Sequence, residues 1–303
     1  IIFYIKKGGK LKPNTTLIKP LLKESIPIAT VRIGTSVVAM LISVIMPAML
    51  THFGSTLNEA VADFGVAVGM TFPLLSVPGI IIGSIAVALL PEISSGNANE
   101  IKKQINSSLS YSIMISLILF PIFFILGDKI GIWLYGNALS GELLKAGSFL
   151  LLPLGVSQIT SSILNALEKE KRGLIIQAIS AVSLIVCILI LPKFCGIYSL
   201  LWGFGAMNVL ASILNLIAIK EFLTREPLTI LIKNMIMCIP ACLFALFVNG
   251  ICTSVTMSNV LSIIASSSVS VGSLVIMLIA FNMVDIKQFF HKKPRKQPAT
   301  IKS

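Results

Sequence analysis

Eight long apolar segments constrain this sequence more than any other feature. They occupy roughly residues 26–50, 64–90, 107–126, 145–164, 174–191, 197–219, 233–251 and 259–281. About 20 apolar residues in an α-helix cross the hydrocarbon core of a bilayer, whereas the strands of a membrane barrel are shorter and alternate in polarity. We therefore expect an all-α integral membrane protein with eight transmembrane helices.

The composition excludes a soluble domain of ordinary type. Of the 303 residues, 55% are hydrophobic and only 12% are charged, whereas a typical soluble domain has about 25% charged residues. In a membrane protein the net charge of +12 does not serve to keep the chain soluble, so it needs another explanation.

The positions of the basic residues supply that explanation. Of the 24 Lys and Arg, 20 lie before the first segment, in alternate loops and in the tail, and three lie on the opposite side. Because Lys and Arg accumulate in cytoplasmic loops, we expect a multi-pass protein of the cytoplasmic (plasma) membrane with both ends of this chain in the cytoplasm. The basic loops and the tail (285–303) would then attract anionic lipids, and we expect no nucleic-acid partner.

Arg32 lies inside the first segment, where a charge costs free energy in lipid. Helical spacing places it on one face with the small residues Ser36, Ala39 and Ser43, while bulky aliphatic residues occupy much of the rest. Small polar residues suit a neighbouring helix or a cavity. We therefore predict that Arg32, Ser36 and Ser43 line a cavity in which the guanidinium binds an anion such as phosphate. The alternative is an arginine that reaches back to the headgroups.

The second segment contains residues that bend helices. Pro73 and Pro78 each remove a backbone donor, and Gly79 follows directly; such broken spans are frequent where transporters bend or bind. We predict a hinge at these three residues, with a kink that serves packing alone as the alternative. Gly65 and Gly69 form a GxxxG pair that would permit close helix contact.

Chemistry of other kinds has little support in the sequence. The uncharged polar residues of the fourth and sixth segments, such as Gln158 and Asn208, suit hydrogen bonds between helices, with a hydrophilic path as the alternative.

Cys238 and Cys242 share a helix face, but no His or carboxylate is near in sequence, so we interpret them as packing residues. No catalytic motif is present. We expect a non-enzyme with no metal and no cofactor.

Several stretches, taken in order, resemble one transporter family. They are IPIATVRIG, GMTFPLLSVPGIIIGSIAVALLPEISSGNANEIKKQIN, WLYGNALSGELLK, SSILNALEKEKRG and LWGFGAMNVLASILNLIAIKEFL. Together they are similar to the polysaccharide transporter (flippase) branch of the multidrug/oligosaccharidyl-lipid/polysaccharide superfamily, in particular to its stage V sporulation protein B-like members.

The resemblance implies the C-terminal portion of a two-lobe, fourteen-helix flippase. Residues 1–222 would form the six-helix C-terminal lobe with a cytoplasmic lead-in, residues 223–284 two additional transmembrane helices, and residues 285–303 a basic cytoplasmic tail. The N-terminal lobe is absent from this chain and would be its partner. Alternating access between the lobes would move lipid-linked oligosaccharide or polysaccharide precursors of the peptidoglycan type, as in cell-wall or spore formation, with Arg32 at the diphosphate.

Two other functions are compatible with the sequence. One is a related multidrug or metabolite cation antiporter, although no carboxylate lies in the middle of a segment, where ion-coupled antiporters keep one. The other is a non-transporting membrane fragment.

Overall fold

The computed structural model describes residues 15–95, 97–254 and 259–280, and helices make up nearly all of them. The long helices are α2 (Thr15–His52), α5 (Val77–Ser95), α6 (Ala98–Tyr135), α8 (Leu151–Ala166), α9 (Glu170–Ile190), α11 (Tyr198–Ala218), α12 (Glu226–Ser254) and α13 (Asn259–Ala280). The short ones are α3 (Leu57–Val66), α4 (Phe72–Leu75), α7 (Ala138–Gly147) and α10 (Pro192–Cys195).

These helices confirm the all-α membrane class. Within the described residues, five helices are long and apolar enough to cross a membrane, with α7 and α8 taken as one, and a sixth results if the bent pair α3–α5 counts as one span. Two shorter apolar stretches, Ser36–His52 in α2 and Ile263–Leu274 in α13, fall below that length. Each of the eight predicted segments coincides with a helix or with consecutive helices.

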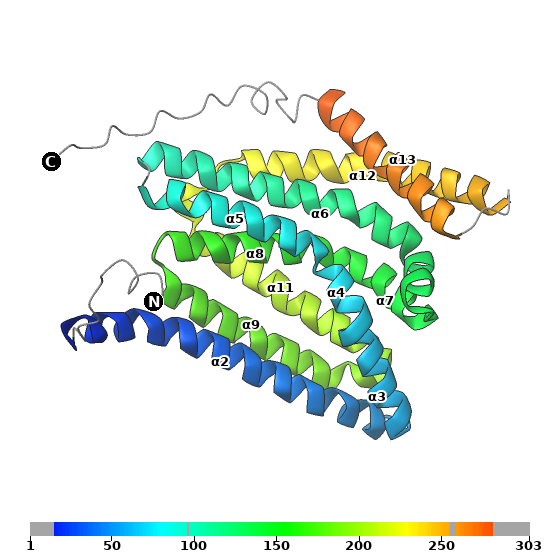
Figure 1. Cartoon of the computed structure of the whole chain (residues 1–303), viewed down its shortest axis with the longest axis horizontal. Coiled ribbons are helices and arrows are strands. Elements are labelled where there is room, and N and C mark those ends of the chain that lie inside the picture. Colours follow the sequence, from blue (N-terminus) through cyan, green and yellow to red (C-terminus); the bar gives the residue numbers. More distant parts are fainter. Residues whose placement is uncertain (1–14, 96, 255–258, 281–303) are drawn as a thin grey trace, which may run out of the picture.

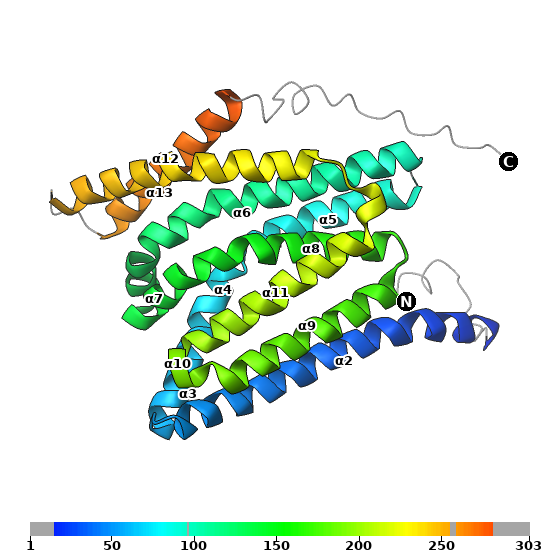
Figure 2. The same ribbon diagram turned by 180° about the vertical axis from the view of Figure 1, so that it is seen from behind.

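The helices form a row that is covered on one face. From one edge, α2 packs on α9, α9 on α11, α11 on α8, α8 on α6, and α6 on the pair α12–α13 (Figures 1 and 2). α5 packs on both α6 and α8 and lies on the side that Figure 1 presents to the viewer. In the described part of the chain, α2 is therefore an edge helix, and its principal long neighbour is α9.

The connections separate into two ends. The α5–α6, α8–α9 and α11–α12 connections lie at one end of the row, and the α2–α3, α6–α7 and α9–α11 connections at the other (Figure 1). The basic loop residues Lys102, Lys169, Arg172 and Arg225 belong to the first group. We call this end the basic end; its cytoplasmic location stays a prediction, and the tail lies outside the described residues.

The span that follows α2 begins earlier than its hydrophobicity predicts, at Leu57 rather than at residue 64. A capping box explains the difference: Thr56 Oγ1 accepts from the Glu59 amide (3.3 Å), and the Thr56 amide donates to Glu59 Oε2 (2.9 Å). This reciprocal pair satisfies two orphan donors of the helix start. Asp63, which directly precedes the predicted segment, consequently lies within α3.

Polar side chains join α8 to α11, which confirms that they bond between helices. Ser157 Oγ donates to Asn208 Oδ1 (2.7 Å), and Asn215 Nδ2 donates to Thr160 Oγ1 and Ser161 Oγ (3.1 Å each). Ser157, Asn208 and Asn215 are buried. Each bond therefore satisfies groups that would be costly to leave unpaired in an apolar interior.

Close helix contact occurs at glycines other than the predicted pair. A Cβ added to Gly65 or Gly69 would meet nothing within 4 Å, so the expected GxxxG contact is wrong for the described helices. On α6 and α7, by contrast, a Cβ at Gly131 would collide with the Gly141 amide nitrogen, and one at Gly141 would lie 2.7 Å from the Asp128 Cα. The absence of side chains at these two glycines lets the α6 and α7 backbones meet.

A buried amide fastens the basic end. Asn106 on α6 is 1% exposed; its Nδ2 donates to the carbonyls of Lys102 and Phe222 (2.7 Å each), and its Oδ1 accepts from the amide and the hydroxyl of Thr224 (2.8 and 2.9 Å). All the bonds that a side-chain amide can make are thus used. They fix the α11–α12 connection to α6.

Candidate functional site

The second span is broken where the sequence places its prolines. Leu57–Leu75 and Val77–Ala88 meet at an angle of 44°, and a π-helical turn, Ala67–Thr71, precedes the break. Ser76 lies between the two parts, where its amide donates to the Phe72 carbonyl (3.0 Å) and its hydroxyl to the Pro73 carbonyl (2.7 Å). The break therefore lies between Pro73 and Pro78, and its action as a hinge stays a prediction.

A glutamine from α8 binds the backbone just after this break. Gln158 Nε2 donates to the Gly79 carbonyl (2.7 Å). A Cβ at Gly79 would lie 2.6 Å from Gln158 Oε1, and one at Gly83 would lie 3.3 Å from Nε2. The two glycines, one helical turn apart, thus form a shallow channel in which the amide lies. This contact gives Gly79 a role in packing, in addition to the role in helix bending that the sequence predicts.

A pocket of about 480 Å³ opens at the same place. α4 and α5 contribute one wall, and α8 and α11 contribute the opposite wall, with Phe72, Gly79, Gly83, Leu154, Gln158 and Phe204 among the lining residues. The lining is apolar apart from Ser76, the Gln158 amide and nearby backbone. Such a pocket accommodates an apolar chain or ring and offers it a few polar contacts.

The predicted small face of α2 is exposed. Ser36 and Ser43 are both exposed, and Ser43 Oγ donates to the Met40 carbonyl (2.7 Å). Met46 and Leu50 turn into the core, whereas Val44 is 64% exposed. Around the helix the serine stripe therefore lies between the packed face and an exposed bulky face.

The structure does not bring all predicted site residues together. Gly79 lines the pocket, and Pro73 and Pro78 flank the break beside it, but Ser36 and Ser43 lie on α2, which is not among its lining helices. The backbone of Arg32 belongs to α2, while its side chain lies outside the described residues. The sequence shows Gln158 only as a polar residue, and nothing in its spacing identifies Gly79 as its partner.

No metal site is evident in the part of the chain that the structure describes. Those residues contain no group of three or more His, Cys, Asp or Glu that could hold a metal ion. The Cys238 thiol donates to the Leu117 carbonyl (3.4 Å) and is buried, which agrees with a packing role.

Comparison with known proteins identifies a similar fold. No family model matches the sequence, and no curated protein matches it. Among solved structures, the lipid II flippase MurJ in an inward closed conformation is similar, with a TM-score of 0.66 and 16% sequence identity. The match covers 91% of this chain and 57% of that one, so this chain spans little more than half the length of the flippase structure.

Proposed function

We propose that this chain is one lobe of a flippase that moves a lipid-linked saccharide diphosphate across the cytoplasmic membrane. The observation that carries the proposal is the fold: nearly all of this chain superposes on part of a lipid II flippase. Substrates of this class combine an anionic diphosphate with a long apolar chain. The proposed site offers Arg32 for the first and the pocket beside Gly79 for the second.

The exposed small residues of α2 support this assignment. Ser36, Ala39 and Ser43 are exposed, although bulky aliphatic residues are the usual choice for a surface against lipid. A second lobe facing this stripe would enclose a hydrated space between the lobes. Water in that space would lower the cost of keeping Arg32 charged within the membrane.

In the proposed mechanism, the broken span moves while the rest of the lobe stays rigid. Pro73 and Pro78 reduce the backbone bonds that resist bending, and Gln158 holds the span through the Gly79 carbonyl. α6, α8 and α11 are joined by buried contacts and polar bonds. Bending of the second span at this break would accompany the alternation of access between the two lobes.

The test is transport by the protein that carries both lobes, reconstituted in liposomes with a fluorescent polyprenyl diphosphate saccharide. We expect Arg32→Ala to reduce the rate strongly and Arg32→Lys to retain part of it. Arg225→Ala is the matched control, because Arg225 is exposed in the α11–α12 connection. Equal rates for Arg32→Ala and the control would exclude the proposed role of Arg32.

Other outcomes would assign the protein to another class. Ion-coupled export of a drug that requires Arg32 but no lipid-linked sugar would indicate a cation antiporter. Intact cell-envelope and spore-cortex synthesis in cells with Arg32→Ala would indicate a non-transporting protein. Because one lobe encloses no two-sided cavity, the 303-residue chain by itself is expected to show no turnover, and turnover by this chain alone would contradict the two-lobe mechanism.

A further inference from the structure

Another pocket of about 480 Å³ opens at the end opposite the basic end, between α6, the α7 segment and α11. α7 also contacts the broken span, because Thr71 Oγ1 donates to the Ser140 carbonyl (3.4 Å). This pocket nevertheless shares no lining residue with the pocket at Gly79, and the proposed transport mechanism does not use it. Its lining combines three charged and three aromatic side chains: Asp128, Glu142, Lys145, Phe124, Phe149 and Tyr198.

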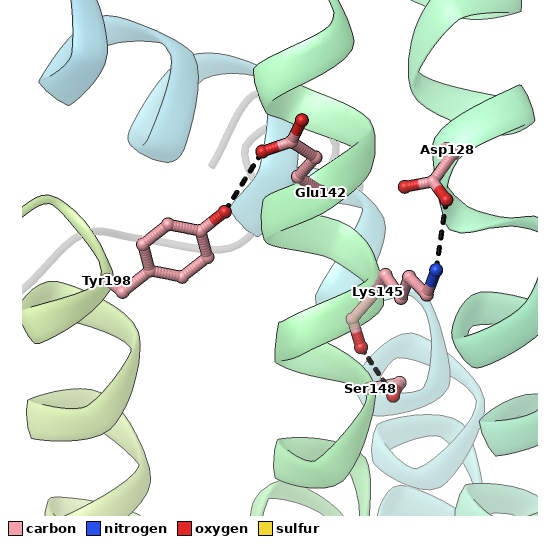
Figure 3. A network of polar contacts seen from close by, with 5 residues as sticks. All are labelled: Asp128, Glu142, Lys145, Ser148 and Tyr198. Carbon is pink, nitrogen blue, oxygen red and sulfur yellow. Dashed lines mark hydrogen bonds and ion pairs between the residues drawn. The ribbon is translucent and has the colours of Figure 1, made fainter. Parts of the chain in front are cut away.

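Charges of both signs meet at its mouth (Figure 3). Lys145 Nζ donates to Asp128 Oδ2 (3.1 Å), and the Tyr198 hydroxyl donates to Glu142 Oε2 (3.1 Å). Lys145 and Asp128 are only half-buried, with side-chain exposures of 46% and 45%, and Glu142 is exposed. An ammonium has three donors and a carboxylate about four acceptor positions. The bond to Asp128 uses one donor of Lys145, and the bond from Tyr198 uses one acceptor position of Glu142, so both groups can bind a further partner.

Aromatic rings form the inner part of the same pocket. Phe124 lies one helical turn before Asp128 on α6, and Phe149 one turn after Lys145, so both lie nearer the middle of the helix row than the charges do. Their ring centroids are 5.4 Å apart, and Phe120, a further turn inward, lies within 5.5 Å of both. Phe149 is 55% exposed. The pocket is therefore polar at its outer end and apolar toward the middle of the helices, which is the polarity that a lipid at the surface of a bilayer has.

We propose that this pocket binds the headgroup of a zwitterionic phospholipid such as phosphatidylethanolamine. Its phosphate pairs with Lys145, its ammonium pairs with Glu142, and its acyl chains lie along the phenylalanines. Glu142 and Lys145 are three residues apart on α7 and both line the pocket, with Glu142 directed toward Tyr198 and Lys145 toward Asp128 (Figure 3). The lipid carries its two charges on separate groups, so each group has one of these side chains as its partner. A purely anionic lipid would satisfy Lys145 but would place no positive charge beside the carboxylates.

Native mass spectrometry of the purified protein tests this inference. The protein is mixed with equal amounts of dioleoyl phosphatidylethanolamine and dioleoyl phosphatidylglycerol, and the retained lipids are counted. We expect the wild-type protein to retain more phosphatidylethanolamine. Glu142→Gln should lower the ratio of retained phosphatidylethanolamine to phosphatidylglycerol about fivefold, because a solvent-accessible ion pair changes a binding constant by about this factor.

The matched control is Glu100→Gln, which changes an exposed carboxylate on α6 at the basic end and should leave the ratio unchanged. Unaltered melting of Glu142→Gln would show that the pocket is still folded. A wild-type ratio near one, or equal ratios for the Glu142 and Glu100 variants, would overturn the proposal. So would displacement of the lipid by soluble phosphoethanolamine at an equal concentration, because the phenylalanines would then contribute nothing.

Discussion

Asn106 provides the sharpest test of how this lobe is held together. Its amide makes four bonds, and three of them reach the α11–α12 connection through Phe222 and Thr224. Asn106→Ala removes all four. The Lys102 carbonyl lies within α6 and does not depend on this side chain alone. The groups that lose a hydrogen-bond partner are therefore mainly the Phe222 carbonyl and the Thr224 amide.

The size of the effect follows from these two groups. Each buried polar group that loses its partner costs ~1–1.5 kcal/mol when water can partly replace the bond, which gives ~2–3 kcal/mol in total. Thr224 is exposed, so water can reach that side, and the low end of the range applies there. With an unfolding entropy of ~2.1 cal/mol/K per residue, a chain of 303 residues shifts by ~1.6 °C per kcal/mol, so the melting temperature should fall by ~3–5 °C.

The assay is thermal unfolding in detergent, followed by the amount of monodisperse protein that survives heating. Asn165→Ala is the control, because Asn165 is exposed on α8 near the same end. Asn106→Asp should be at least as harmful as Asn106→Ala, since it turns a carboxylate oxygen toward two carbonyls. Melting of Asn106→Ala within about a degree of the control would refute this reasoning.

Three further predictions concern other contacts. Gly79→Ala should lower the melting temperature because its Cβ would lie 2.6 Å from Gln158 Oε1; the loss should shrink in a Gln158→Ala background, and a double-mutant cycle measures this coupling. Gly131→Ala should lower the free energy of unfolding by ~1–3 kcal/mol or more, since the atoms that its Cβ would meet belong to the α7 backbone. Gly65→Ala, at an exposed position of α3, should not lower the melting temperature in the same assay. The hydrogen bond and charge of Lys169 lower the pKa of Glu221, so this stabilisation is present above the ordinary Glu pKa of ~4.3 and disappears as pH falls through the lowered value. Melting between pH 7 and pH 3 should therefore decline less for Lys169→Met, and parallel declines would contradict the pairing.

Hydrophobic length and helix-breaking residues predicted much of this fold. Each apolar run coincides with a helix or with consecutive helices, and Pro73 and Pro78 bracket the observed break. The early start of α3 was also readable, because Thr56 and Glu59 have capping-box spacing. These features depend on residues that are close together in the sequence, so the sequence alone is enough to predict them.

Contacts between distant residues were beyond prediction. Gln158 meets Gly79 across 79 positions of sequence, and no periodicity specifies that partner. The GxxxG motif was misleading because it identifies a surface that permits close approach without identifying a helix that approaches. The pocket at Glu142 and Lys145 also required the structure, because α11 supplies Tyr198 from far along the chain.

The glycine contact between α6 and α7 has a consequence for biosynthesis. These helices are consecutive in the chain and meet backbone to backbone at Gly131 and Gly141, so their association needs no later part of the sequence. Because closing a short loop costs little entropy, this hairpin can assemble at the insertion machinery while α8 and later helices are still being synthesised. It would then give each of them a preformed surface to join, and a bulky residue at Gly131 would delay assembly from its first step.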